Sequence, residues 1–140
     1  MLYISGFGVT EISTKTGSMK NAGTDDYVSL TVCDTTGACC TTALDNKSVD
    51  DRQKGRVDTF ADSLVLGDCF NARLDGQLTA TLSKLKSDGW YVEWAKIKLS
   101  SGKSFTCLFN SWLDNSGGHK NSMTVTCNKG KELCYITINI

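Results

Sequence analysis

The stretch Tyr27-Val-Ser-Leu-Thr-Val-Cys33 alternates apolar residues with serine and threonine. This period of two is typical of a strand with one buried and one exposed face. Turn-forming Asp, Asn and Gly residues separate it from further stretches of the same kind, at residues 2–15, 76–82, 90–99, 103–109, 123–127 and 133–140. Short strands with turns between them predict an antiparallel β-sandwich or barrel.

Two local features refine this pattern. Within residues 90–99 the alternation slips, and a bulge near Trp94 or Ala95 would return the apolar side chains to one face. Residues 49–54 allow one helical turn, but they are too polar for a core helix.

Length, charge and hydropathy limit the class of protein. The 140 residues fit one domain, and we expect a single domain over residues 1–140. The 15 basic residues balance the 15 acidic residues, which argues against a nucleic-acid partner. No apolar run is long enough to span a membrane, and Met1 does not open a signal-peptide pattern, so neither segment is expected.

The cysteines indicate the compartment. The spacing of the seven residues does not suit a zinc site, so disulfides in a secreted protein are favoured over buried thiols in a reducing cytosol. An odd number leaves one thiol free or paired between chains. A turn-like stretch between Cys127 and Cys134 suggests a hairpin that would join these two. The disulfide candidates are Cys33, Cys39, Cys40, Cys69, Cys107, Cys127 and Cys134.

Signatures of catalysis are absent from the sequence. It contains no G-x-S-x-G, no glycine-rich phosphate loop and no H-E-x-x-H. The single histidine, His119, stands in a polar stretch without a group to orient it as a base. The sequence therefore predicts a protein that is not an enzyme.

Three loops are rich in oxygen ligands: residues 21–26, 45–51 and 87–89. Calcium (Ca2+) takes six to eight oxygen ligands, and a sandwich gathers its loops at two ends. The simpler interpretation is that these residues only form turns. The composition of the loops leaves both interpretations open.

Several motifs resemble those of PLAT domains, the lipoxygenase-homology β-sandwiches. Asn21-Ala-Gly-Thr-Asp-Asp-Tyr-Val28 resembles their A-G-T-D-x-x-V signature, and Asp88-Gly-Trp-Tyr-Val-Glu-Trp-Ala-Lys-Ile97 resembles their G-W stretch. Phe105-Thr-Cys107 and the following Trp112-Leu113 resemble F-x-C-x-x-W-L with two extra residues. The resemblance runs from about Val9 to Leu113. It implies an all-β antiparallel sandwich of about eight strands; most of the cysteines have no place in the family pattern.

The resemblance also implies three calcium sites. The first would use Asn21, the Gly23 carbonyl, Asp88 and the Gly89 carbonyl. The second would use the Thr24 carbonyl, Asp25 and residues near Val49 and Asp50, and the third Asp45, Asn46, Ser48 and Asp50. Asn21 stands where an aspartate is usual, which suggests a Kd of roughly 10⁻⁴ to 10⁻³ M. Residues 46–48 also form a glycosylation sequon, which would conflict with the third site.

Aromatic residues supply the expected contact with a partner. Trp90 and Trp112 are expected to pack in the core or just beneath the surface. Phe70 and Tyr91 are expected to be exposed, where they could enter a membrane interface while a cation bridges lipid phosphates.

These expectations define a secreted, non-enzymatic calcium-binding module that reversibly binds membrane lipid headgroups or a protein partner. One alternative is a disulfide-stapled structural or recognition module of the venom, mucus or host-interaction kind, without calcium dependence. Its contact would be an edge strand or the odd cysteine. A further alternative is an accessory domain of an enzyme.

Overall fold

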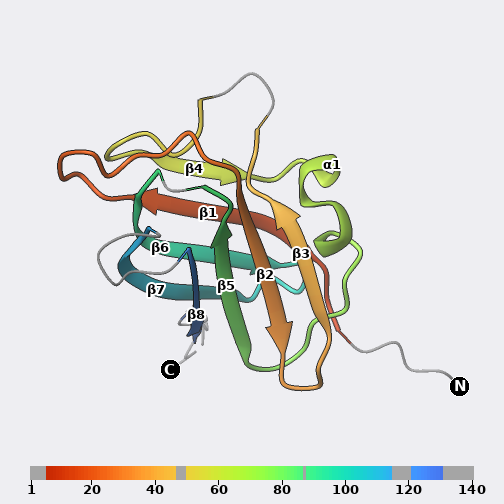
Figure 1. Cartoon of the computed structure of the whole chain (residues 1–140). Helices are drawn as coiled ribbons and strands as arrows, with labels where there is room; N and C mark the ends of the chain where they lie inside the picture. The colour runs from red at the N-terminus through yellow and green to blue at the C-terminus, as the bar shows by residue number, and fades with distance from the viewer. Residues whose placement is uncertain (1–5, 47–49, 87, 115–120, 131–140) are drawn as a thin grey trace, which may run out of the picture.

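A computed structural model describes residues 6–46, 50–86, 88–114 and 121–130. These residues form two antiparallel sheets that pack face to face (Figure 1). The strands are β1 (Val9–Thr16), β2 (Val28–Asp34), β3 (Cys39–Ala43), β4 (Val57–Phe60), β5 (Leu78–Lys84), β6 (Trp90–Leu99), β7 (Ser104–Leu113), β8 (Ser122–Thr126) and β9 (Asn128–Lys129).

The order of strands is β4-β1-β6-β7-β9 in one sheet and β3-β2-β5-β8 in the other. Every pair of neighbouring strands is antiparallel. In β2 the apolar residues are buried and the residues between them are half-buried, as the alternation predicts. The expected all-β antiparallel sandwich is confirmed.

Strand β6 has the bounds that the sequence predicts. Its register with β7 shifts between Val92 and Trp94, so the expected bulge is present. Because of this shift, Val92 and Ile97 are both fully buried although their spacing is odd. The expected segments at residues 2–5 and 133–140 lie outside the described residues.

The expected helical turn at residues 49–54 is wrong for the described residues 50–54, which contain no helix. The short helix α1 (Ser63–Leu66) lies elsewhere, followed by the 3-10 turn η1 (Gly67–Cys69). Asp62 caps α1, because its Oδ1 accepts a hydrogen bond of 2.8 Å from the Leu64 N–H. No helix in the described part of the chain is long and apolar enough to cross a membrane.

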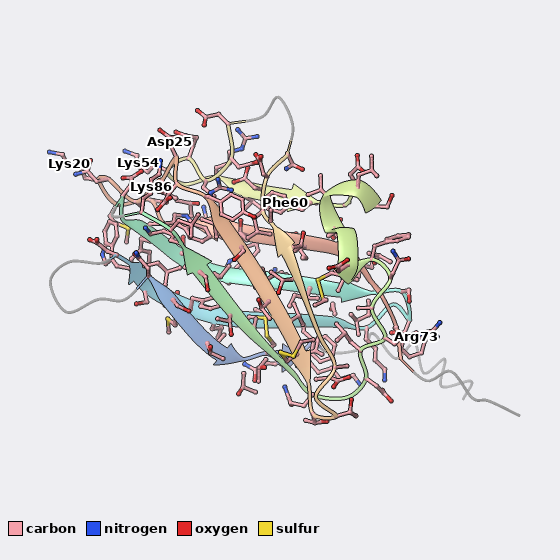
Figure 2. The ribbon with its side chains drawn as sticks, turned by 45° about the vertical axis from the view of Figure 1, so that its right-hand side comes forward. Lys20, Asp25, Lys54, Phe60, Arg73 and Lys86 are labelled. Atoms are coloured by element: carbon pink, nitrogen blue, oxygen red, sulfur yellow. A yellow bond between two sulfur atoms is a disulfide. The ribbon has the colours of Figure 1, made fainter. Side chains whose placement is uncertain are left out.

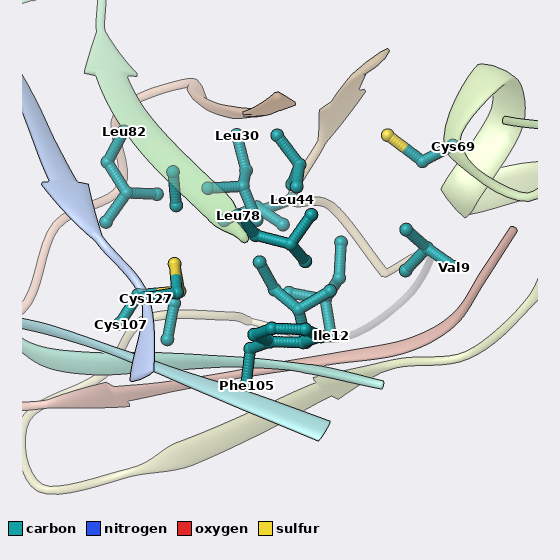
Figure 3. Close-up of a cluster of buried hydrophobic side chains, with 14 of the residues drawn as sticks. Val9, Ile12, Leu30, Leu44, Cys69, Leu78, Leu82, Phe105, Cys107 and Cys127 are labelled. Carbon is teal, nitrogen blue, oxygen red and sulfur yellow. A yellow bond between two sulfur atoms is a disulfide. The ribbon is translucent and has the colours of Figure 1, made fainter. Parts of the chain in front are cut away.

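The core lies between the sheets (Figure 3) and contains Ile12, Leu30, Leu44, Leu78 and Leu82. Trp90 is fully buried and its Nε1 donates a hydrogen bond of 2.9 Å to the Thr16 hydroxyl. Trp112 is half-buried. Both tryptophans are therefore placed as expected.

Disulfides join Cys33 to Cys39, Cys40 to Cys69 and Cys107 to Cys127. The expected hairpin disulfide between Cys127 and Cys134 is therefore wrong. Cys127 follows β8 and turns toward β7, where its Cα lies 4.1 Å from that of Cys107. Cys134 and His119 lie outside the described residues.

Candidate functional site

Three segments distant in sequence meet at the end of the sandwich where β1 ends and β6 begins. They are residues 17–27, residues 50–55 and the described residues of 85–91, which exclude residue 87, and we call this end of the molecule the rim. The Tyr91 N–H donates to the Ala22 carbonyl (2.9 Å), and the Thr24 N–H donates to the Arg52 carbonyl (3.1 Å). Figure 2 shows Lys20, Asp25, Lys54 and Lys86 at this end.

Asp88 joins the first and the third of these segments. Its Oδ2 accepts hydrogen bonds from the Thr24 hydroxyl at 2.9 Å and from the Asp25 N–H at 3.1 Å. The Thr24 hydroxyl in turn accepts a hydrogen bond of 3.1 Å from the Asp26 N–H. Loops separated by more than sixty residues are thus held together by side-chain contacts.

A hollow of about 490 Å³ opens beside this contact, lined by Asn21, Asp88, Gly89, Trp112 and Asp114. Asn21 has φ 63°, in the left-handed region that asparagine tolerates better than most residues. A β-carbon at Gly89 would lie 3.3 Å from Asp114 Oδ2, so the Asp114 carboxylate packs closely on this backbone. The structure thus gathers Asn21, Asp88 and Gly89 of the first predicted site and adds Asp114, whereas Gly23 packs against the Arg52 carbonyl and does not line the hollow.

The chemistry of these groups fits a hard cation. Two carboxylates, one amide and the nearby backbone carbonyls are oxygen ligands of the kind that calcium takes. Within the described ranges there is no group of three or more carboxylate, histidine or cysteine side chains that could hold an ion. A cation in the hollow would therefore also need the Asn21 amide, backbone carbonyls and water, which suits weak binding.

The residues predicted to bind calcium at the second and third sites make other contacts or are exposed. The Asn46 backbone N–H and side-chain amide donate to the Asp51 carboxylate at 2.7 and 3.1 Å, so Asn46 binds the buried Asp51 and not Asp50. Asp25 Oδ1 accepts a hydrogen bond of 3.3 Å from the Gln53 amide. Asp45 and Asp50 are exposed, and Ser48 lies outside the described residues. No contact between described residues joins either set into a site.

A buried ion pair supports the rim from below. Lys84 Nζ lies 2.9 Å from Asp26 Oδ2, and both side chains are fully buried. The same oxygen accepts a hydrogen bond of 2.7 Å from the Lys86 N–H, and Asp26 Oδ1 accepts one of 2.8 Å from the Tyr27 N–H. Burial by itself would raise the pKa of Asp26, but these contacts outweigh it and lower the pKa. Asp26 thereby fixes the segment before β2 to the segment after β5.

Arg52 ties the middle segment to the same place. It is buried with φ 63°, and its Nη2 donates a hydrogen bond of 3.0 Å to the Asp26 carbonyl. Its backbone N–H donates to Asp58 Oδ2 at 2.8 Å, and Asp58 Oδ1 pairs with Arg56 Nε at 2.9 Å. Burial raises the pKa of Asp58, and the neighbouring Asp51 carboxylate adds to the rise.

Exposed apolar side chains and lysines lie on the same end of the molecule as the hollow. Leu85 is 74% exposed and Met19 is 42% exposed, and both belong to rim segments. Lys20, Lys54 and Lys86 are exposed on the same end (Figure 2). The exposed carboxylates of Asp25, Asp50 and Asp88 lie on the same segments, so the rim carries charges of both signs. Isolated loop residues such as Leu85 carry no periodic signal that would reveal their exposure.

The two aromatic residues predicted to contact a partner do not share a location. Tyr91 is half-buried and packs edge to face on Trp112, with ring centroids 5.5 Å apart, beside the hollow. Phe70 is exposed, but it lies at the other end of the sandwich, where its carbonyl faces Gly8 just before β1. The expectation that Phe70 stands next to a bound cation is corrected by this geometry.

Known proteins resemble this chain in sequence and in fold. No family model matches the sequence. Lipoxygenase homology domain-containing protein 1 from Homo sapiens is 32% identical over 106 residues, which are 73% of this chain and 5% of that protein. The protein of the same name from Mus musculus is 31% identical over 106 residues, with the same coverage. The chain thus spans about one-twentieth of the length of these curated relatives.

Solved structures share the fold. The alpha toxin from Clostridium absonum superposes with a TM-score of 0.60 at 23% identity, over 89% of this chain and 32% of the toxin chain. A coral 8R-lipoxygenase, described as activated by calcium via a C2-like domain, gives a TM-score of 0.64 at 16% identity. That match covers 84% of this chain and 16% of the lipoxygenase chain. Sequence motifs, sheet order and these similarities define a β-sandwich of the lipoxygenase-homology class. The chain is a PLAT-like domain.

Proposed function

We propose that this domain is a non-enzymatic module that docks reversibly on phospholipid membranes in a calcium-dependent manner. The observation that carries the proposal is the hollow at the rim, which is lined by Asn21, Asp88 and Asp114. The exposed side chains of Leu85 and Met19 belong to the segments that form the same rim. The calcium activation described for the coral 8R-lipoxygenase supports the choice of cation.

Different side chains of this chain would bind calcium, enter the membrane interface and contact anionic lipids. The carboxylates of Asp88 and Asp114 and the amide of Asn21 would hold calcium, which supplies positive charge toward a lipid phosphate. Leu85 would enter the interface and contribute about 1.5–3 kcal/mol. Each lysine near an anionic surface would add about 1 kcal/mol. Contributions of this size give reversible attachment.

An extracellular location agrees with the same features. Three disulfides join described cysteines, and such bonds persist in oxidising compartments. Calcium sites with few charged ligands operate at extracellular calcium concentrations of roughly 10⁻⁴–10⁻³ M. The proposal therefore places the domain outside the cell.

Sedimentation with vesicles tests this function. The full chain is mixed with phosphatidylcholine vesicles that contain phosphatidylserine, in millimolar calcium or in excess chelator. We expect binding in calcium and release by chelator. Leu85→Ser should weaken the binding several-fold, because it removes the most exposed apolar side chain of the rim.

Leu108→Ser is the matched control, because Leu108 is an exposed leucine on β7, away from the rim. It should bind vesicles like the unaltered chain. Equal binding in calcium and chelator would contradict the mechanism. A complete lack of binding and of any calcium-induced rise in Tm would favour a disulfide-stapled recognition module instead.

A further inference from the structure

Strand β4 is a short edge strand whose outer side is only partly covered. In the described part of the chain it pairs with β1 alone, so one side of its backbone faces away from the sheet (Figure 1). The sequence Val57-Asp-Thr-Phe60 contains no proline or lysine, the residues that commonly block such edges. On the other sheet, α1 and η1 are attached to the inner face of β3, where the Thr42 hydroxyl donates to the Val65 carbonyl at 2.6 Å and Cys40 is joined to Cys69.

The hydrogen bonds show which groups of β4 point outward. The Thr16 N–H of β1 donates to the Arg56 carbonyl at 3.0 Å, so residue 56 faces β1. The Thr59 carbonyl instead accepts a hydrogen bond of 3.0 Å from the Asn46 side chain, on the other side. Because these directions alternate along a strand, the N–H and C=O groups of Val57 and Thr59 face away from the sheet.

A groove of about 940 Å³ lies along this edge, between β4 and the wall made by α1 and the end of β3. Its apolar surface includes Leu64, which is 87% exposed, and Val57, which is 49% exposed. Its charged groups are three carboxylates, from Asp45, Asp58 and Asp62, against one guanidinium, from Arg56. Arg56 is already paired with Asp58, so the groove presents the negative charge of Asp45 and Asp62.

We propose that this groove binds an extended, basic segment of another polypeptide, which adds to β4 as a strand. The outward N–H and C=O groups of Val57 and Thr59 would supply main-chain hydrogen bonds. Leu64 and Val57 would contact apolar side chains of the segment, and Asp45 and Asp62 would bind its lysine or arginine side chains. The Asn46 amide would leave the Thr59 carbonyl as the strand enters.

A second copy of this chain suits the groove less well. Pairing of β4 with β4 of another copy would bring equal negative charges toward one another, and like charges across a strand pair are unfavourable. The proposal uses neither the rim nor calcium, so it stands or falls separately from the membrane function.

The test is a titration of the isotope-labelled full chain, without lipid or calcium, followed by amide chemical shifts. The probe is a short peptide with blocked ends that alternates valine with lysine. We expect saturable shifts centred on Val57 and Thr59. Thr59→Pro should weaken binding at least tenfold, because it removes an outward N–H while the preceding Asp58 is already extended.

A charge variant keeps the test valid if Thr59→Pro does not fold. Asp45→Lys should weaken the binding several-fold at low salt, whereas Asp68→Lys, an exposed aspartate outside the groove, should leave it unchanged. A peptide that alternates valine with glutamate should bind at least tenfold more weakly. The proposal is overturned by shifts that appear elsewhere or not at all. It is also overturned by equal binding of the two peptides, or by edge shifts that depend on protein concentration without peptide.

Discussion

Asn21 brings no charge to the hollow, although the PLAT resemblance predicts a calcium-binding carboxylate at this position. Its backbone already has a conformation that aspartate also tolerates, with φ 63°. We therefore expect Asn21→Asp to raise calcium affinity by about tenfold or more, because it adds a negative ligand without a backbone rearrangement. Isothermal titration calorimetry measures the change.

Asn110→Asp is the matched control for this substitution. Asn110 is also an asparagine with positive φ, 44°, and it is exposed on β7. It adds the same charge at a residue that does not line the hollow, so calcium affinity should change far less than for Asn21→Asp. If both variants gained equally, the effect would come from net charge and Asn21 would not be a ligand.

The carboxylate of Asp34 makes the stability of the turn between β2 and β3 depend on pH. Its Oδ1 accepts hydrogen bonds from the N–H groups of Thr36 (2.9 Å) and Ala38 (3.0 Å), and its Oδ2 accepts one from the Asp75 N–H (3.0 Å). Burial would raise the pKa of Asp34, but the hydrogen bonds from the Thr36 hydroxyl and these three N–H groups lower it below the ordinary value of 3.8.

Because the unfolded chain binds a proton at Asp34 more readily, the stabilisation is present above pH 3.8 and is lost as the pH falls through the lowered pKa. We expect Asp34→Asn to reduce the free energy of unfolding by about 1–3 kcal/mol at neutral pH. This difference should shrink as the pH is lowered below 3.8. Urea unfolding of both proteins over this range is the measurement, and a difference independent of pH would contradict the assignment.

At the scale of elements, the disulfides constrain the strands unequally. Cys40 and Cys69 are 29 residues apart and join β3 to η1, whereas Cys33 and Cys39 are 6 residues apart and join neighbouring strands. A disulfide stabilises a protein by restricting its unfolded chain. Replacing both Cys40 and Cys69 with alanine should therefore lower the free energy of unfolding by about 3–4 kcal/mol. The same calculation gives about 2 kcal/mol for Cys33 and Cys39. Urea unfolding that showed the opposite order would contradict this.

The same elements show how far the sequence predicts the fold. Strand β2 was predictable because its alternation over seven residues is distinctive, and β6 because a single bulge accounts for the slip in its alternation. Strand β4 was not, because Val57–Phe60 is short and half polar. The disulfide partner of Cys127 could not be predicted either, because it depends on which strands become neighbours in the fold.

The candidate site was likewise predicted only in part. The meeting of Asn21 with Asp88 and Gly89 followed from the family motifs, because both segments carry that resemblance. Asp114 and Leu85 were missed, because each follows a strand directly and only the arrangement of strand ends brings it to the rim. No sequence pattern indicated the buried ion pair of Asp26 and Lys84, because the two residues are distant in the sequence and meet only in the folded chain.

At the scale of the whole molecule, the sandwich has two different ends. The rim carries Lys20, Lys54 and Lys86, whereas the opposite end carries Phe70, with Arg73 nearby (Figure 2). The eight residues of β1 separate the ends by about 25 Å. A membrane plane that touches the rim therefore leaves Phe70 in water.

This geometry predicts opposite outcomes for two apolar residues of nearly equal exposure. Met19, 42% exposed, belongs to the rim, and Phe70, 45% exposed, belongs to the other end. In calcium-dependent vesicle sedimentation, Met19→Ser should bind several-fold more weakly, because a side chain that enters the interface is lost. Phe70→Ser should bind like the unaltered chain. Equal losses in the two variants would mean that the molecule lies on its side, and a loss in Phe70→Ser alone would place the membrane at the end opposite the calcium ligands.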